Sequence, residues 1–123
     1  MLKVYKRSIG TISILCLQGR VVIGATLLLR KAVLAEMNCS AVALDFARVT
    51  RLDAHGIGVL LELREHCISK GIEFQLVNVS ALVQSILHIS RLTTVFEIVT
   101  EENVVVRTSP NRFDVVLRSA PCA

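Results

Sequence analysis

The sequence predicts an α/β sandwich in which three to four helices pack on a mixed sheet of four to five strands. Short segments rich in β-branched residues, either apolar throughout or alternating between polar and apolar side chains, are followed along the chain by segments of helical periodicity. Few glycines and prolines interrupt them. The chain has 123 residues, of which 53% are hydrophobic and 20% are charged. This length and composition fit one domain with its own core.

The first part of the chain predicts two strands, a helix and a third strand. Residues Leu2–Arg7 and Thr11–Leu17 alternate polar and apolar side chains, with a turn at 8–10, which predicts a hairpin. From Gly24 to Met37 alanine and leucine replace β-branched residues, which predicts a helix. The segment Ala41–Phe46 is nearly all apolar and predicts a central strand covered on both faces by helices.

The second part continues with a helix, a strand and a helix. Asp53 is expected to cap a helix over His55–Lys70, and Gly71 is expected to end it in a left-handed conformation. Residues Phe74–Val79 predict the next strand. Ser80 is expected to cap the following helix.

The end of the chain carries weaker patterns. Val95–Val99 predicts a short strand that closes a domain of residues 1–99, and residues 100–123 are expected to form an extension. Thr100 and the two glutamates after it are typical of a helix start, whereas the valines at 104–106 favour a strand. From Ser109 onward the sequence leaves a closing hairpin and a loose tail open.

Charge and composition exclude several classes of function. The net charge is +4 and the basic residues are scattered, with no Trp, one Tyr and four Phe, so nucleic-acid binding is not expected. The longest uncharged stretch, Phe74–Ser90, contains many polar side chains and is not expected to insert into a membrane. We therefore predict a cytoplasmic protein.

The cysteines and histidines do not predict a metal site. The four cysteines are far apart, with no CxxC pair: Cys16, Cys39, Cys67 and Cys122. Most lie in apolar segments, so we expect free thiols that pack as small hydrophobes. His55 and His66 would lie about 16 Å apart on one helix, and His88 has no ligand-spaced neighbour, so neither a metal nor a cofactor is expected.

A motif precedes the helix that follows the central strand. Residues 45–58 read Asp-Phe-Ala-Arg-Val-Thr-Arg-Leu-Asp-Ala-His-Gly-Ile-Gly. This segment resembles the STAS family, the bacterial anti-sigma factor antagonists and their relatives, whose pattern has apolar-Asp-Ser-Ser-Gly-Leu-Gly at a helix start. The resemblance runs from about Val4 to Ile98. The matching positions are Leu52, Asp53, Gly56, Ile57, Gly58, Val59, Leu60, Gly71, Leu76 to Val79 and Leu92.

The resemblance implies a regulatory protein-interaction domain in signal transduction and transcription regulation, and not an enzyme. Such a domain binds an anti-sigma factor that is also a serine kinase. The sequence leaves open whether the domain forms a homodimer. The alternative is a STAS accessory subunit of an ABC-type lipid-trafficking transporter or of another signalling complex.

The resemblance also implies the site. In the family the second Ser of the motif accepts phosphate, and here His55 occupies that position after Ala54, so neither residue offers a hydroxyl. Thr50 is the nearest hydroxyl before the motif. The partner is expected to bind the loop and helix start through Arg48, Arg51, Asp53, Ala54, His55, Gly56 and Ile57. From the residues alone, Asp53 is most simply a helix cap, and the glycines allow close packing of the helix start.

Overall fold

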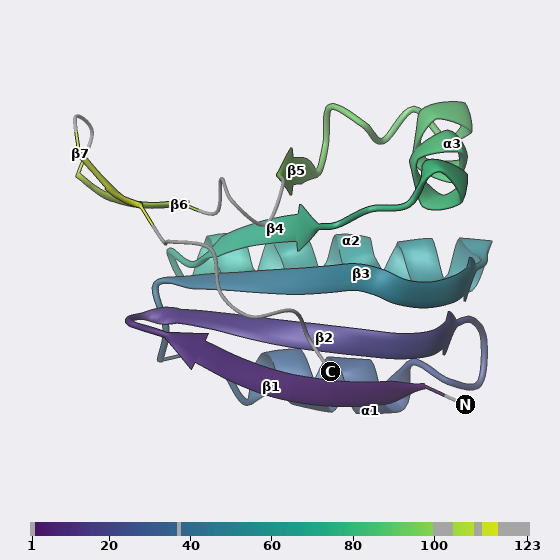
Figure 1. Cartoon of the computed structure of the whole chain (residues 1–123), viewed down its shortest axis with the longest axis horizontal. Coiled ribbons are helices and arrows are strands. Elements are labelled where there is room, and N and C mark those ends of the chain that lie inside the picture. Colours follow the sequence, from purple (N-terminus) through teal and green to yellow (C-terminus); the bar gives the residue numbers. More distant parts are fainter. Residues whose placement is uncertain (1, 37, 100–104, 110–111, 116–123) are drawn as a thin grey trace.

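The chain forms a five-stranded sheet with three helices on it and a separate two-stranded hairpin, as a computed structural model shows (Figure 1). The structure describes residues 2–36, 38–99, 105–109 and 112–115. The elements are β1 (Lys3–Ile9), β2 (Ile12–Val21), α1 (Leu27–Leu34), β3 (Ala41–Leu52), α2 (Ala54–Ser69), β4 (Glu73–Val77), α3 (Ala81–Ile89), β5 (Glu97–Val99), β6 (Val105–Ser109) and β7 (Arg112–Val115).

The sheet is mixed, with the strands in the order β1-β2-β3-β4-β5. β1 and β2 pair antiparallel through the turn at Gly10, and the remaining neighbours pair parallel. Because parallel strands need crossover connections, α1, α2 and α3 each follow a strand of the sheet and precede the next. The predicted fold class is confirmed.

All three helices contribute to one core on one face of the sheet. Leu29 and Val33 of α1, Leu60 of α2, and Val83 and Leu87 of α3 belong to the same buried cluster. A smaller cluster lies on strands β2, β3 and β4 alone: Ile12, Ile14, Cys16, Ala41, Ala43 and Val77. The prediction that helices cover both faces of the central strand is therefore wrong; helices cover one face.

The central strand is longer than predicted. It runs to Leu52 and not to Phe46, so Arg48 and Arg51 lie in β3 and not in a loop. Pairing with β2 extends it, since Gln18 is opposite Arg48 and Arg20 is opposite Arg51. The sequence pattern ended the strand at Phe46 because a buried strand is recognised by its apolar run. Beyond Phe46 the arginines face solvent, and hydrogen bonds to β2 keep the backbone extended.

The described C-terminal residues form the β6–β7 hairpin, with Val105 opposite Val115. The helix start expected at Thr100 lies outside the described residues. Cys39 and Cys67 are free thiols, as predicted, and burial raises the pKa of the Cys67 thiol to about 11. Cys16 is disulfide-bonded, so the expectation of a free thiol is wrong there. Among the described residues, no helix is both long and apolar enough to span a membrane.

The start of α2 packs very closely against the end of β2. A Cβ added at Gly56 would lie 2.1 Å from the carbonyl oxygen of Val21. That oxygen belongs to the backbone and also accepts the Asp53 N–H at 3.3 Å, so it has little freedom to move. Only glycine fits at position 56. Gly58, in the next turn, meets nothing within 4 Å of an added Cβ.

We therefore expect Gly56→Ala to lower the free energy of unfolding by at least about 1–3 kcal/mol, because the added methyl displaces α2 from the sheet. Gly58→Ala is the matched control and should raise that free energy by up to about 1 kcal/mol, since alanine favours the helix. Urea unfolding followed by circular dichroism measures both. Equal effects of the two substitutions would contradict the close approach.

Candidate functional site

Asp53 holds together the two chain segments that form the site. Its Oδ1 accepts the Gly56 N–H at 2.8 Å, which caps α2, and its Oδ2 accepts the Ile23 N–H at 3.0 Å. The first bond confirms the predicted helix cap. The second bond was not predicted. Because it joins positions 30 residues apart, Asp53 also fixes the loop between β2 and α1 beside the start of α2.

The surroundings of Asp53 favour its charged form. The N–H of Ile23, and next the N–H of Gly56, lower the pKa of the Asp53 carboxyl below its ordinary value of 3.8. A carboxylate at a helix N-terminus also complements the partial positive charge there. Asp53 is therefore ionised at neutral pH and is already committed to two backbone donors.

Ala54 and His55 lie exposed in the first turn of α2. Their side chains are thus accessible to a partner, as the sequence predicts for a recognition site. His55 Nε2 is hydrogen-bonded to Thr26 Oγ1 at 3.3 Å, and Thr26 is the N-cap residue of α1. The imidazole therefore joins the starts of two helices. The same two helices meet again through an ion pair between Arg30 and Glu62.

Two residues predicted to contact a partner lie in the interior. Gly56 is buried against Val21, and the side chain of Ile57 is only 9% exposed and belongs to the core. The start of a helix packed on a sheet turns one side inward, so consecutive motif residues cannot all face outward. Their role is to hold the helix start in place. A charge at Ile57 would destabilise the core, which leaves Ala54 as the position that tests binding.

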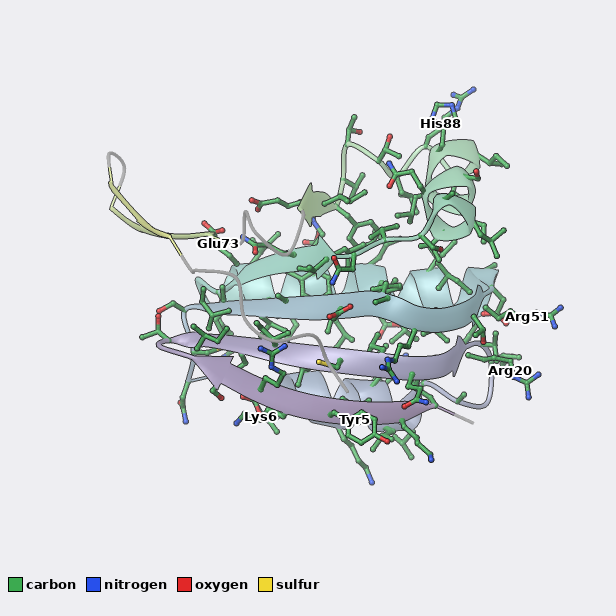
Figure 2. The ribbon with its side chains drawn as sticks, in the orientation of Figure 1. Tyr5, Lys6, Arg20, Arg51, Glu73 and His88 are labelled. Atoms are coloured by element: carbon green, nitrogen blue, oxygen red, sulfur yellow. The ribbon has the colours of Figure 1, made fainter. Side chains whose placement is uncertain are left out.

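Exposed arginines lie on the two strands that end near the start of α2. Arg48 and Arg51 are exposed, as is Arg20, which lies opposite Arg51 on the neighbouring strand. Figure 2 shows Arg20 and Arg51 reaching into solvent at the edge of the sheet where β2 and β3 end. None of the ion pairs found within the described residues involves these arginines. They make this edge electropositive.

The described part of the chain offers no metal site, because no group of three or more His, Cys, Asp or Glu side chains comes close enough to hold an ion. His88 is exposed on α3 (Figure 2). The arrangement at α2 consists of an engaged carboxylate, an imidazole bonded to a hydroxyl and nearby guanidinium groups.

The chain belongs to the STAS domain family, whose model matches residues 3–105. The match covers the sheet, the three helices and the site at the start of α2. The comparison with curated proteins found no match.

Several solved structures share the fold. An anti-sigma factor antagonist from Mycobacterium paratuberculosis is 17% identical, covers 80% of this chain and 85% of its own, and has a TM-score of 0.71. The anti-sigma factor antagonist SpoIIAA in its unphosphorylated form is 18% identical over 81% of this chain and 90% of its own, with a TM-score of 0.68. A sulfate transporter family protein from Wolinella succinogenes is 23% identical over 76% and 80%, with a TM-score of 0.62.

Three residues of the site were missed by sequence reasoning. Ile23 and Thr26 contact the motif from the preceding loop, and Arg20 adds to its charge through strand register. Thr26 precedes a leucine-rich helical segment, which is a capping signal, although its side chain makes no cap bond. The other two positions carry no local signal, because their place depends on which residues pair across β2 and β3.

Asp53 should make the folded protein lose stability in acid. The pKa of Asp53 is lowered below 3.8 in the folded chain. Its contribution to the free energy of unfolding is therefore fully present above pH 3.8, and it is lost as the pH falls through the lower pKa of the folded state. Asp53→Asn has a single carboxamide oxygen and can accept only one of the two N–H groups. We expect the melting temperature of the variant to be lower at pH 7, and the difference from wild type to shrink between about pH 5 and pH 2.

The control for this measurement is Glu65→Gln, which removes an exposed carboxylate from the far side of α2. Its melting temperature should follow that of the wild type across the same pH range. A difference between Asp53→Asn and wild type that stays constant from pH 7 to pH 2 would contradict the proposed role of the ionised carboxylate.

Proposed function

We propose that this domain is a cytoplasmic anti-sigma factor antagonist that binds an anti-sigma factor of the serine-kinase type through the exposed start of α2. In that role it frees a sigma factor and so regulates transcription. The domain itself performs no catalysis. The observation that carries the proposal is an accessible Ala54–His55 pair at the position where the STAS motif has two serines.

The charge and shape of the site support a protein partner. Exposed arginines near the helix start would steer an acidic partner surface toward it. The hydrogen bonds between Asp53 and the backbone keep the binding surface of this domain pre-organised. A contact centred on Ala54 and His55 and extended over Arg48 and Arg51 would bury on the order of 800 Å² on each side. Such an area is sufficient for a specific complex.

The site lacks the group that a serine kinase modifies. Phosphorylation at a helix start adds about 1.5 to 2 negative charges and breaks a packed contact by repulsion and desolvation. Ala54 has no oxygen, and the imidazole of His55 is engaged with Thr26. Thr50 is exposed, but its hydroxyl donates to the carbonyl oxygen of Gly19 and lies on β3. Binding in this protein is therefore not switched at the usual position.

A negative charge placed at Ala54 should imitate the missing phosphate. We expect Ala54→Glu to weaken binding to the anti-sigma factor of the same organism by about 100-fold, because a glutamate would be buried unpaired in the contact. Glutamate is favourable in the first turn of a helix, so the fold should be kept. Isothermal titration calorimetry with the purified anti-sigma factor measures the change.

Ala81→Glu is the matched control, because Ala81 is the exposed first residue of α3 after its N-cap Ser80, just as Ala54 follows Asp53. It should leave the affinity within about twofold of wild type. Equal binding by wild type and Ala54→Glu would show that the partner does not contact the start of α2.

Restoring a hydroxyl should restore the switch. We expect His55→Ser to accept phosphate when incubated with the kinase and ATP, and we expect the wild-type protein to remain unlabelled, because a serine there lies at an accessible helix N-terminus. Intact-protein mass spectrometry detects the added phosphate, and Asp53→Asn/His55→Ser tests whether the cap positions the hydroxyl. Label on His55 of the wild type would contradict the proposal.

A second candidate is a STAS subunit of a transport machine or of another signalling complex. The observation that favours it is the structural similarity to a sulfate transporter family protein, together with the absence of a hydroxyl at positions 54 and 55. Co-purification with a transport ATPase, and not with an ATP-binding anti-sigma factor, would decide for this candidate.

A further inference from the structure

Helix α1 exposes a second apolar face that the fold does not use. Leu29 and Val33 face the core and are fully buried. On the opposite side Leu27 is 63% exposed, while Leu28 and Leu34 are each 46% exposed, and Ile23 just before the helix is 71% exposed. Isolated exposed leucines are ordinary, but four large aliphatic side chains exposed within twelve residues are a concentration of the kind that marks interaction surfaces.

A groove runs beside this face. It has a volume of about 510 Å³ and is lined by Leu2, Gly24, Ala25, Leu27, Leu28 and Lys31. The size lies within the range of about 300–1,000 Å³ that is typical of binding sites. Five of the six lining residues are apolar or glycine. The groove and the exposed side chains Ile23, Leu27, Leu28 and Leu34 together are called the α1 surface below.

Lys31 gives the α1 surface its sign of charge. It is exposed on α1 between Leu27 and Leu34, and within the described part of the chain it forms no ion pair. The neighbouring acids are already engaged, because Glu36 pairs with Lys6 and Glu62 pairs with Arg30. A partner that covers the leucines therefore binds more tightly with a negative charge opposite Lys31 than with a neutral or positive group there.

This charge decides among the possible occupants. In a two-fold contact centred on the middle of α1, residues near the axis meet their own counterparts, and Lys31 lies there, so two ammonium groups would approach each other, which is repulsive. Attraction to an anionic lipid surface takes clusters of about four to eight cations, whereas among the described residues one cation lines the groove. An amphipathic helix with a carboxylate between apolar side chains satisfies both the leucines and Lys31, as helices do in grooves of this type.

We infer that the α1 surface is a second docking site, which takes an amphipathic helix of a partner protein with leucine-like side chains around one acidic residue. The site goes beyond the proposed function, because the contact proposed there is centred on Ala54 and His55. Leu27 and Leu28 anchor the helix in the groove. Lys31 pairs with the carboxylate and fixes the register.

The inference can be tested with a phage-displayed library of amphipathic helices in which leucines are fixed at positions i, i+3 and i+7 and position i+4 carries all amino acids. Selection on the full-length wild-type chain should enrich Asp and Glu at i+4 by about tenfold over Lys and Arg, because the carboxylate pairs with Lys31. Selection on Lys31→Glu should reverse that preference. Enrichment that is the same on both proteins would overturn the inference.

Apolar anchoring is tested with the best peptide from that selection. Leu27→Gln/Leu28→Gln should weaken its binding by at least about 30-fold in fluorescence anisotropy, since the groove loses its two anchors. Ile89→Gln is the matched control, because Ile89 is 80% exposed on α3 and lies outside the groove, and it should not change the affinity. An unchanged affinity of the double variant would overturn the inference.

The same variants test two other possible occupants of the α1 surface, a second copy of the chain and a lipid membrane. Sedimentation velocity of the wild type tests self-association, and flotation with vesicles containing phosphatidylserine tests lipid binding. Dimerisation or vesicle binding that Leu27→Gln/Leu28→Gln abolishes would assign the α1 surface to a second copy or to a membrane, and would overturn the helix assignment. Binding of the peptide is independent of Ala54→Glu, so this test can fail without affecting the proposed function.

Discussion

The two oxygens of one carboxylate set the geometry of the whole functional edge. Asp53 caps α2 through Gly56 and also holds the backbone of Ile23, which belongs to the loop before α1. These bonds work only because Gly56 lets the helix approach the carbonyl of Val21 at a distance that no other residue tolerates. A carboxylate with two backbone donors is a stronger constraint than a neutral cap, since each bond is charge-assisted. Ala54 and His55 are thereby displayed on a rigid support.

The chemistry of this edge depends on which side chains are hydrogen-bonded within the domain and which are exposed to solvent. The Asp53 carboxylate accepts two backbone N–H groups, and Nε2 of the His55 ring is hydrogen-bonded to Thr26. The exposed guanidinium groups at the ends of β2 and β3 take part in none of the ion pairs within the part of the chain that the structure describes. Fixed positive charge beside a flat, small residue such as Ala54 suits recognition of an acidic protein surface.

The sequence predicted those parts of the fold that local patterns determine. The α2 helix, its Asp53 cap and the Gly71 terminus follow from residue preferences within a few positions, and they were found as expected. The end of β3 was missed because pairing with β2 holds Arg48 and Arg51 in a strand, although charged side chains are not a sequence signal for one. Ile57 was misplaced on the surface because the helix turns it toward the core. Contacts from Ile23 and Thr26 depend on register and loop position, which one sequence does not encode locally.

The loop between β2 and α1 joins the two surfaces that remain open on the molecule. Its Ile23 N–H is held by Asp53 while the Ile23 side chain belongs to the α1 surface, and Thr26 at its end is bonded to His55. Positions 54 and 55 carry no hydroxyl, so a serine kinase has no acceptor at this end of α2. Under the two proposals above, rigidly connected surfaces would allow simultaneous engagement by one partner or by two, with the second contact made at high effective concentration. Control would then come from the availability of the partners, whereas serine-bearing motifs place it on the domain itself.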